Sequence, residues 1–174
     1  IRYIFSKNMT TVLFTNGVKL ANDDNLLSLL LENDVSPVVK FNSRNESIQD
    51  LLGGKKGYTA QRDIALNKLI DAGFNSPTPT RLGVDILALK GNYEELREIH
   101  IWCRDNNIFP IIADYIPTGR TEGGQFVGFD ALENFEKTEI LSTLKFLLPV
   151  TNGERKKLLK SIEAVDKEYK INRN

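Results

Sequence analysis

Four short segments decide the fold: Thr10-Thr-Val-Leu-Phe-Thr-Asn-Gly17, Pro37-Val-Val-Lys-Phe-Asn-Ser43, Arg81-Leu-Gly-Val-Asp-Ile-Leu-Ala-Leu-Lys-Gly91 and Phe109-Pro-Ile-Ile-Ala-Asp-Tyr-Ile-Pro-Thr-Gly119. Each contains a continuous apolar run, as expected of a parallel strand that is buried on both faces. Helical stretches separate the segments, and strands that alternate with helices favour right-handed βαβ units. The sequence therefore predicts an α/β fold whose consecutive parallel strands form part of a (β/α) barrel.

Polar side chains follow each predicted strand. In a parallel barrel the functional groups lie at the carboxyl ends of the strands, because these ends meet at one rim. We therefore expect the functional site at this rim. The expected rim residues are Thr15, Asn16, Lys40, Asn42, Ser43, Lys90 and the turn from Pro117 to Arg120.

The helices between the strands follow from apolar residues at helical spacing. Asp23 and Asp24 precede a leucine-rich stretch, so an acidic first turn predicts a helix that ends near Asn33. Pro37 is expected to open the second strand, because a missing N–H is tolerated at a first residue. A short helical turn is expected over residues 48–52, and longer helices over 59–72, 94–107 and 154–169.

The pattern changes after residue 120. We expect residues 1–120 to form the partial barrel and residues 121–174 to form a C-terminal loop and helical extension. Residues 121–130 are predicted to be a glycine-containing loop, and residues 131–148 favour neither helix nor strand. The chain opens on Ile1, and its first eight residues resemble the end of a helix. This opening predicts a fragment of a longer protein.

Composition excludes several classes of partner. The 174 residues hold 23 Lys and Arg against 23 Asp and Glu without long runs of either sign, so we expect no nucleic-acid partner. No apolar run approaches the roughly 20 residues that cross a bilayer, so no membrane partner is expected. The single cysteine, Cys103, predicts a reducing compartment, by default the cytoplasm. Small molecules or proteins are the expected partners.

Two local patterns invite a ligand but are better explained by structure. Gly53-Gly-Lys-Lys-Gly57 could cradle a phosphate, yet it lacks the spacing and the Lys-Ser/Thr pair of a P-loop, so a turn entering a helix is favoured. His100 and Cys103 are spaced to meet one metal ion on a helix. The chain holds no other histidine or cysteine to complete that site. We therefore interpret the pair as part of a partly buried helix face.

Charged residues near the rim leave several roles open. Asp85 and Asp114 lie within predicted strands, and Asp114 could point into the barrel as an acid or base. It could equally pair with Lys40, Arg81 or Lys90. The lysines and Arg81 could instead anchor a ligand that carries a carboxylate.

Taken in order, the segments resemble the core of the radical S-adenosylmethionine superfamily, in the branch of the molybdopterin-pathway cyclase and of enzymes with a SPASM extension. Thr15-Asn-Gly17 is similar to the end of that family's third strand. Val38 to Ser43, with the turn Gly53 to Gly57, is similar to the fourth. Leu87-Ala-Leu-Lys-Gly-Asn-Tyr-Glu-Glu-Leu96 resembles the fifth strand and its continuation, and Ala113-Asp-Tyr-Ile-Pro-Thr-Gly119 resembles the sixth.

The resemblance covers residues 8–120 and implies that the chain holds strands three to six of a six-strand barrel. Glu154 to Tyr169 is similar to the helix that leads toward auxiliary-cluster domains. In this family a [4Fe–4S] cluster cleaves S-adenosylmethionine at the rim, and the resulting radical abstracts hydrogen from the substrate. The cofactor-binding residues that the resemblance implies are Thr15, Asn16, Lys40, Asn42, Ser43, Arg81 and the backbone of Ile116.

One departure from the family is large. The family's cluster is held by three thiolates in a Cys-x-x-x-Cys-x-x-Cys motif after the first strand, whereas this chain has one cysteine. The resemblance therefore implies that the first two βα units are absent and that both cofactors belong to a full-length parent. The chain itself would ligate no metal and would be inactive, and no catalytic residue is assigned. Its exposed sheet edges would favour self-association.

Two other functions stay open from the sequence. One is a non-catalytic binding or scaffold domain that presents a cationic rim to a protein or a phosphorylated ligand. The other is an aldolase-type barrel in which Lys40 or Lys90 forms a Schiff base with a carbonyl substrate. A three-cysteine motif in the coding sequence upstream of Ile1 would favour the radical enzyme over the scaffold.

Overall fold

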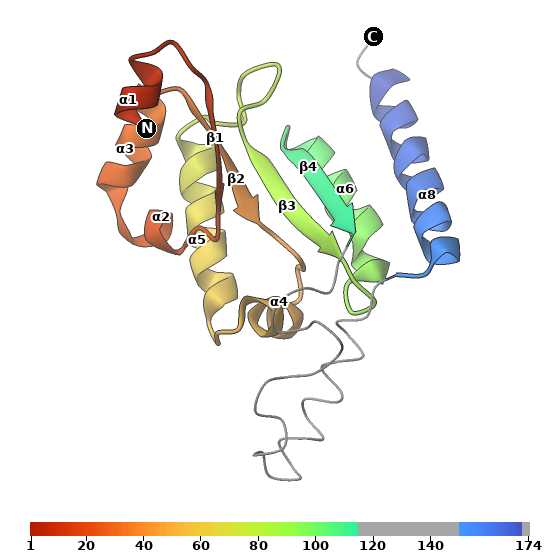
Figure 1. Cartoon of the computed structure of the whole chain (residues 1–174). Coiled ribbons are helices and arrows are strands. Elements are labelled where there is room, and N and C mark those ends of the chain that lie inside the picture. Colours follow the sequence, from red (N-terminus) through yellow and green to blue (C-terminus); the bar gives the residue numbers. More distant parts are fainter. Residues whose placement is uncertain (115–149, 172–174) are drawn as a thin grey trace, which may run out of the picture.

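The computed structural model describes residues 1–114 and 150–171. Four strands form one sheet in the order β1-β2-β3-β4, and every neighbouring pair is parallel (Figure 1). The order of the strands in space is therefore their order along the chain. This arrangement confirms the predicted α/β class with consecutive parallel strands. The strands are β1 (Thr11–Thr15), β2 (Val35–Lys40), β3 (Gly83–Ala88) and β4 (Phe109–Asp114).

The predicted helices are present, with boundaries shifted by a few residues. Asp23 begins α3 by accepting hydrogen bonds from the backbone N–H groups of Asn25 (3.1 Å) and Leu26 (3.3 Å), which satisfies two otherwise unpaired donors. The five-residue helix α2 was not predicted. The helices are α1 (Arg2–Phe5), α2 (Val18–Asn22), α3 (Asp24–Glu32), α4 (Glu46–Gly53), α5 (Tyr58–Asp71), α6 (Leu96–Asp105) and α8 (Asn152–Ile171), with a 3₁₀ turn η1 (Tyr93–Glu95).

The predicted start of the second strand at Pro37 was wrong, because β2 begins at Val35. Alternate residues of a strand turn their backbone groups toward the same neighbour. Phe41 donates its N–H to the carbonyl oxygen of Asp85 (2.8 Å), so Pro37 also faces the β3 side. The pairing of β2 with β3 begins only at Val38. A proline at position 37 therefore breaks no hydrogen bond between these strands.

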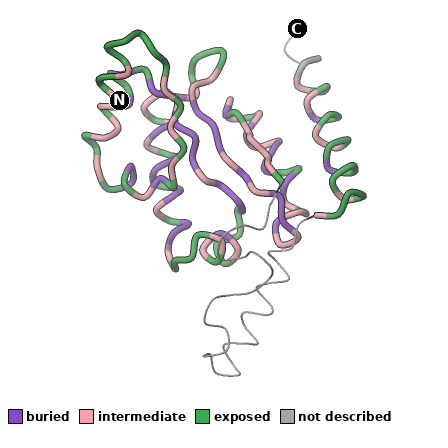
Figure 2. The backbone as a smooth tube through the Cα atoms, in the orientation of Figure 1, coloured by how far each residue is buried: buried purple, intermediate pink, exposed green. Residues whose placement is uncertain are grey.

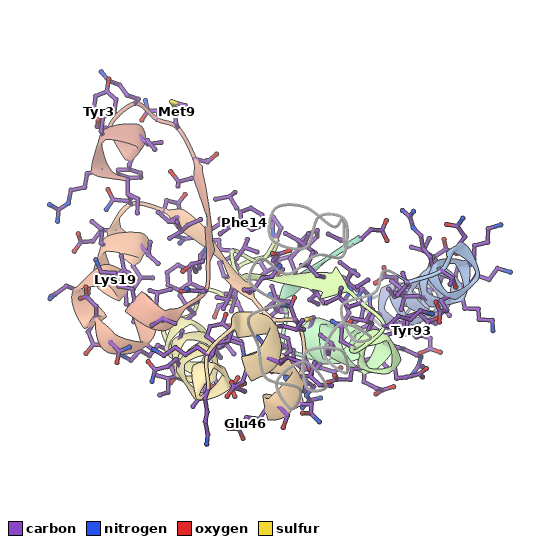
Figure 3. The ribbon with its side chains drawn as sticks, turned by 60° about the horizontal axis from the view of Figure 1, so that its bottom comes forward. Tyr3, Met9, Phe14, Lys19, Glu46 and Tyr93 are labelled. Carbon is purple, nitrogen blue, oxygen red and sulfur yellow. The ribbon has the colours of Figure 1, made fainter. Side chains whose placement is uncertain are left out.

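The two faces of the sheet differ in burial. On the first face, which α5 and α6 cover, Val39, Val84 and Ile86 are fully buried (Figure 1). On the second face, Val12 and Phe14 of β1 keep 60% and 59% of their surface exposed. Figure 3 shows Phe14 projecting from the side of the sheet away from α5. Figure 2 shows that β2 and β3 are the most buried strands.

The C-terminal helix α8 packs beside α6 and extends the hydrophobic core. Its apolar residues Leu158 and Val165 are buried. Asp166 of α8 accepts hydrogen bonds from Arg104 Nε (2.8 Å) and lies 3.1 Å from His100 Nε2, both on α6. The predicted helix over 154–169 is therefore confirmed, and it joins the same core as the sheet.

Several predictions concern residues 115–149, which lie outside the described part of the chain. These are the boundary at residue 120, the loop over 121–130, the segment 131–148 and the turn from Pro117 to Arg120. Within the described ranges, no helix combines the length and the apolar character that crossing a bilayer requires.

Candidate functional site

The carboxyl ends of the parallel strands meet at one edge of the sheet, and this edge is the candidate site. All four strands point in the same direction, and α4 lies at the end toward which they point (Figure 1). Five of the predicted residues lie at or just after the carboxyl ends of β1 and β2, although Thr15, the register partner of Val39, faces the helix side and Lys40 faces the second face. They are Thr15, Asn16, Lys40, Asn42 and Ser43.

The loop that follows β2 is held in place by buried side chains from other elements. Gln49 of α4 is fully buried, and its Oε1 accepts the backbone N–H groups of Asn42 (2.8 Å) and Ser43 (2.9 Å). Asn92 donates from Nδ2 to the carbonyl oxygens of Asn42 (2.6 Å) and Leu87 (2.7 Å). The Oδ1 atom of Asn42 in turn accepts the N–H of Leu87 (3.0 Å). These contacts tie the end of β2 to the end of β3.

Ser43 lies at the centre of a second set of contacts and is fully buried. Its hydroxyl donates to Glu95 Oε1 (2.5 Å) and accepts the backbone N–H of Asn45 (2.9 Å). Its carbonyl oxygen accepts a hydrogen bond from Nη1 of Arg62 on α5 (2.7 Å). The Oδ1 atom of Asn42 and the hydroxyl of Ser43 are thus engaged by the chain itself, so these two side chains shape the rim.

Lys40 and Asp85 form an ion pair on the second face of the sheet. They are register partners on β2 and β3, and Nζ of Lys40 lies 2.7 Å from Oδ2 of Asp85. Their side chains are 28% and 22% exposed, so the pair is partly desolvated but remains accessible. A positive and a negative group therefore lie side by side on the second face, at the carboxyl end of β2 and in the middle of β3.

Thr15 and Asn16 turn the chain from β1 into α2. Thr15 Oγ1 accepts the N–H of Gly17, and Asn16 Oδ1 accepts the N–H of Val18, both at 3.1 Å. Gly17 adopts a left-handed conformation with φ of 80°, which glycine permits at no steric cost. Asn16 is exposed, and its side-chain NH₂ has no partner among the described residues. It is therefore a rim donor available to a ligand.

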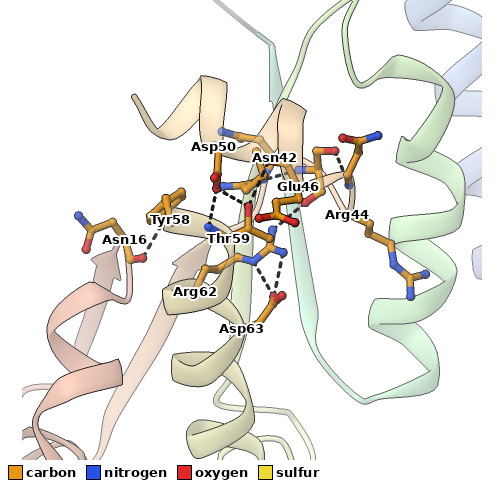
Figure 4. A network of polar contacts seen from close by, with 12 residues as sticks. Asn16, Asn42, Arg44, Glu46, Asp50, Tyr58, Thr59, Arg62 and Asp63 are labelled. Atoms are coloured by element: carbon orange, nitrogen blue, oxygen red, sulfur yellow. Dashed lines mark hydrogen bonds and ion pairs between the residues drawn. The ribbon is translucent and has the colours of Figure 1, made fainter. Parts of the chain in front are cut away.

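The segment from Gly53 to Gly57 joins α4 to α5. It is a turn that enters a helix, as the sequence predicted. The carboxylate of Asp50 accepts the backbone N–H groups of Gly57 (2.5 Å) and Thr59 (2.7 Å), together with the Thr59 hydroxyl (2.6 Å) (Figure 4). Hydrogen bonds from Thr59 hold the pKa of Asp50 below its ordinary value. Because this internal carboxylate occupies the start of α5, the turn does not need a phosphate.

Arg81 is not part of the rim cluster. It precedes β3 and therefore lies at the amino end of the sheet, where its guanidinium pairs with Asp34 (3.1 Å) and donates to the carbonyl oxygen of Val35 (2.9 Å). The guanidinium also lies 5.2 Å from the ring centroid of Phe74. Ile116, whose backbone was expected to face the cofactor, lies outside the described residues.

Lys90 lies just after β3 and binds the C-terminal helix. It forms a close ion pair with Glu154, and the hydroxyl of Tyr93 donates to the carbonyl oxygen of Glu154 (2.8 Å). The hydrogen bond from Lys90, with further hydrogen bonds from Thr151, lowers the pKa of Glu154 to about 2. Lys90 therefore attaches α8 to the rim.

Asp114, the other acidic residue singled out in the sequence, also forms an ion pair. Asp114 pairs with Arg155 of α8 (2.8 Å), which is none of the three partners expected for it. Its register partner is Ala88, a residue of the first-face core, so Asp114 points away from the second face. This corrects the expectation that Asp114 could point inward as an acid or base.

His100 and Cys103 are buried on α6, which agrees with the interpretation as a helix face. Burial raises the pKa of Cys103 to about 12. Burial also lowers the pKa of His100, against the opposing effect of Asp166. The described residues contain no group of three or more His, Cys, Asp or Glu that could hold a metal ion.

Three side chains that the sequence did not indicate hold the loop of residues 41–45 between β2 and α4, here called the rim loop. They are Gln49, Asn92 and Arg62. Their partners are mostly backbone atoms, so no pairing of side-chain types revealed them. Asn92 spans 50 residues to reach Asn42, a distance that a local pattern cannot report. The only local signal was Asn45, whose side chain accepts the N–H of Ile48 at the start of α4 (3.3 Å).

Comparison of the chain with protein-family models, with curated proteins and with solved structures gives no significant match.

Proposed function

We propose that this chain forms four strands of the core barrel of a radical S-adenosylmethionine enzyme and binds the nucleoside cofactor at its carboxyl rim. The observation that carries the proposal is the parallel sheet with strands in chain order, whose polar ends meet at one edge. Such an order is required of consecutive strands in a (β/α) barrel, where the site lies at that edge. The second face of the sheet is then the inner wall.

The described residues do not fit the iron–sulfur cluster. A cluster of this type needs several thiolates. The single cysteine is buried in the helix layer, and the pKa of its thiol is raised to about 12. The cluster ligands of the proposed enzyme must therefore come from polypeptide outside these 174 residues.

The rim does fit the polar end of S-adenosylmethionine. The methionyl part of that cofactor carries an ammonium and a carboxylate group, and Lys40 with Asp85 presents the complementary charges side by side. Asn16 adds an available amide donor. Asn42 and Ser43 position the loop that follows β2, through the Oδ1 atom of Asn42 and the hydroxyl of Ser43.

When bound to a reduced cluster, the cofactor supplies a carbon radical that abstracts hydrogen from the substrate. The residues of this chain contribute binding and orientation. Lys40 and Asp85 hold the ends of the cofactor by charge, and the apolar side chains of the second face, such as Val38, exclude water from the site. The proposed substrate is a small molecule or a peptide, and the proposed location is the cytoplasm.

The proposal is tested on the full-length protein, purified and reconstituted with iron and sulfide without oxygen. We expect about four iron and four sulfide per core domain, a count set by the cluster type. We also expect S-adenosylmethionine to be converted to 5′-deoxyadenosine after reduction. A protein that takes up no iron and forms no 5′-deoxyadenosine would contradict the proposal.

A non-catalytic scaffold is the second candidate. It is favoured by the way the chain satisfies its own rim, since Asn42, Ser43 and Lys90 all have internal partners. A scaffold would bind a protein or a phosphorylated ligand at the rim without any iron. Retention of such a ligand by the iron-free full-length protein, with no affinity for S-adenosylmethionine, would favour this candidate.

A further inference from the structure

A groove of about 340 Å³ lies between α5 and α6, on the helix side of the sheet and apart from the second face. Among helices, α5 packs mainly against α2 and α4, whereas α6 packs against α8. The two helices therefore have different neighbours, and a gap remains between them. A volume of this size matches the lower range of small-molecule sites in proteins.

The floor of the groove is a rigid aromatic platform. Phe41, just after β2, stacks on Trp102 of α6 with ring centroids 5.2 Å apart and an angle of 16° between the planes. The guanidinium of Arg62 covers Phe41 at 4.0 Å from the ring centroid. Arg62 and Phe41 are buried, but Trp102 is only partly buried. Of the two stacked residues, Trp102 is therefore the one that keeps accessible surface, and it lines the groove.

The walls of the groove combine apolar and polar groups. Leu66 and Ile70, one turn apart on α5, supply apolar surface on one side. Asn67 lies at the border and can donate or accept a hydrogen bond. The lining is therefore mixed, with four apolar or aromatic residues and four charged or amide residues, so it can take a ligand that has both an apolar and a charged part.

The charges along the groove favour an anion. Three charged side chains line it, namely Arg44, Arg62 and Asp63. Asp63 pairs with Arg62 at 2.8 Å, which leaves Arg44 as the unpaired charge. Arg44 is exposed, and its guanidinium has no ion-pair or hydrogen-bond partner among the described residues. Figure 4 shows its side chain pointing away from the polar network of the rim.

We propose that this groove binds a planar aromatic carboxylate, with its ring against Trp102 and its carboxylate on Arg44. The ring would gain stacking and apolar contact on the platform, and the guanidinium would form charge-assisted hydrogen bonds with the carboxylate. The groove lies on the helix side of the sheet and shares Arg62 with the loop that follows β2, but the proposal does not depend on the chemistry proposed at the rim.

The experiment uses the single tryptophan as a reporter. Because the chain holds one Trp, its ¹H–¹⁵N spectrum contains one indole Nε1–H signal, that of Trp102. The full chain is titrated with 2-naphthoate and, in parallel, with the neutral 2-naphthalenemethanol. We expect 2-naphthoate to shift the indole signal saturably, together with the backbone amides of Leu66 and Ile70, and the alcohol to bind about tenfold more weakly.

Two variants separate charge recognition from general hydrophobic binding. Arg44→Gln should weaken 2-naphthoate binding about tenfold and leave binding of the alcohol unchanged. Arg97→Gln is the matched control, because Arg97 is an exposed arginine on α6 that does not line the groove. It should leave both affinities unchanged. Both substitutions are at exposed positions, so we expect both variants to fold.

Three results would overturn the proposal. The first is the absence of a saturable indole shift with 2-naphthoate. The second is equal affinity for the acid and the alcohol, which would indicate a hydrophobic surface or a docking face for another protein. The third is an equal effect of Arg44→Gln and Arg97→Gln, which would indicate attraction by the overall charge of the protein.

Discussion

The two faces of the sheet differ in burial and in charge. On the first face, the side chains of Val39, Val84 and Ile86 are sealed under helices and are fully buried. On the second face, Val12 and Phe14 are exposed, and the ion pair of Lys40 and Asp85 stands among apolar neighbours. The difference shows that one face is a buried core, whereas the other carries accessible charge.

The largest expected effect concerns the rim loop, which follows the carboxyl end of β2. Gln49→Leu removes the acceptor of two backbone N–H groups, those of Asn42 and Ser43, and leaves both without a partner. We expect the free energy of unfolding to fall by about 3 kcal/mol, as measured by urea denaturation.

Gln61→Leu is the matched control for that substitution. Gln61 accepts a single hydrogen bond at the surface, from Nδ2 of Asn22 (2.6 Å), so its loss should cost less than about 0.5 kcal/mol. If the two glutamine variants were equally stable, the rim loop would not be held as described.

The next prediction compares the two faces by making the same substitution, valine to alanine, on each. Val84→Ala removes apolar volume from the sealed face, and we expect it to lower the free energy of unfolding by about 2 kcal/mol. Val12→Ala lies on the second face at 60% exposure and should cost less than about 0.5 kcal/mol. Urea denaturation of both variants measures the contrast. Equal losses would mean that the second face is packed as tightly as the first.

A smaller effect is expected from pH at the junction of α6 and α8. Burial lowers the pKa of His100 below its ordinary value near 6.5, so the unfolded chain binds the proton more readily than the folded chain. Stability should therefore be greatest above pH 6.5 and fall as the pH drops from there toward the folded pKa. His100→Asn should remove this dependence between pH 7.5 and 5.5. A stability that rises over the same fall in pH would refute the assignment.

No effect is expected from a test for Schiff-base chemistry. Lys40 and Lys90 both have a carboxylate partner, Asp85 and Glu154, whereas a Schiff-base lysine must be desolvated and uncharged. Borohydride added with a simple aldehyde should label neither lysine in preference to exposed ones, as read by mass spectrometry of peptides. Selective labelling of Lys40 or Lys90 would revive the aldolase interpretation.

Sequence patterns predicted the strands well where the local signal was complete. β1 (Thr11–Thr15) lies inside the predicted segment from Thr10 to Gly17, in which threonines and an Asn-Gly pair enclose Val12 to Phe14. The start of β2 was misplaced because Pro37 resembled a boundary, and only the register with β3 explains its place inside the strand. α2 was missed because five residues are too few for a periodic apolar stripe.

The sequence predicted which strand ends form the rim, but not the contacts that hold the rim in place. Strand polarity alone places Thr15, Asn16 and Lys40 at one edge, and it also places Arg81, which precedes a strand, at the opposite edge. The roles of Gln49 and Asn92 could not be predicted, because each binds backbone atoms that only the folded chain brings near. Contacts between a side chain and a distant part of the main chain therefore could not be predicted from the sequence.

The most direct test of the central claim compares two lysine–aspartate pairs on opposite sides of the sheet. Lys40 pairs with Asp85 on the second face, and Lys68 pairs with Asp24 on the helices at 2.6 Å. Binding of S-adenosylmethionine to the full-length reconstituted protein should weaken about tenfold in Lys40→Gln and stay unchanged in Lys68→Gln. Equal affinities in the two variants, or no binding to the parent protein, would contradict the account.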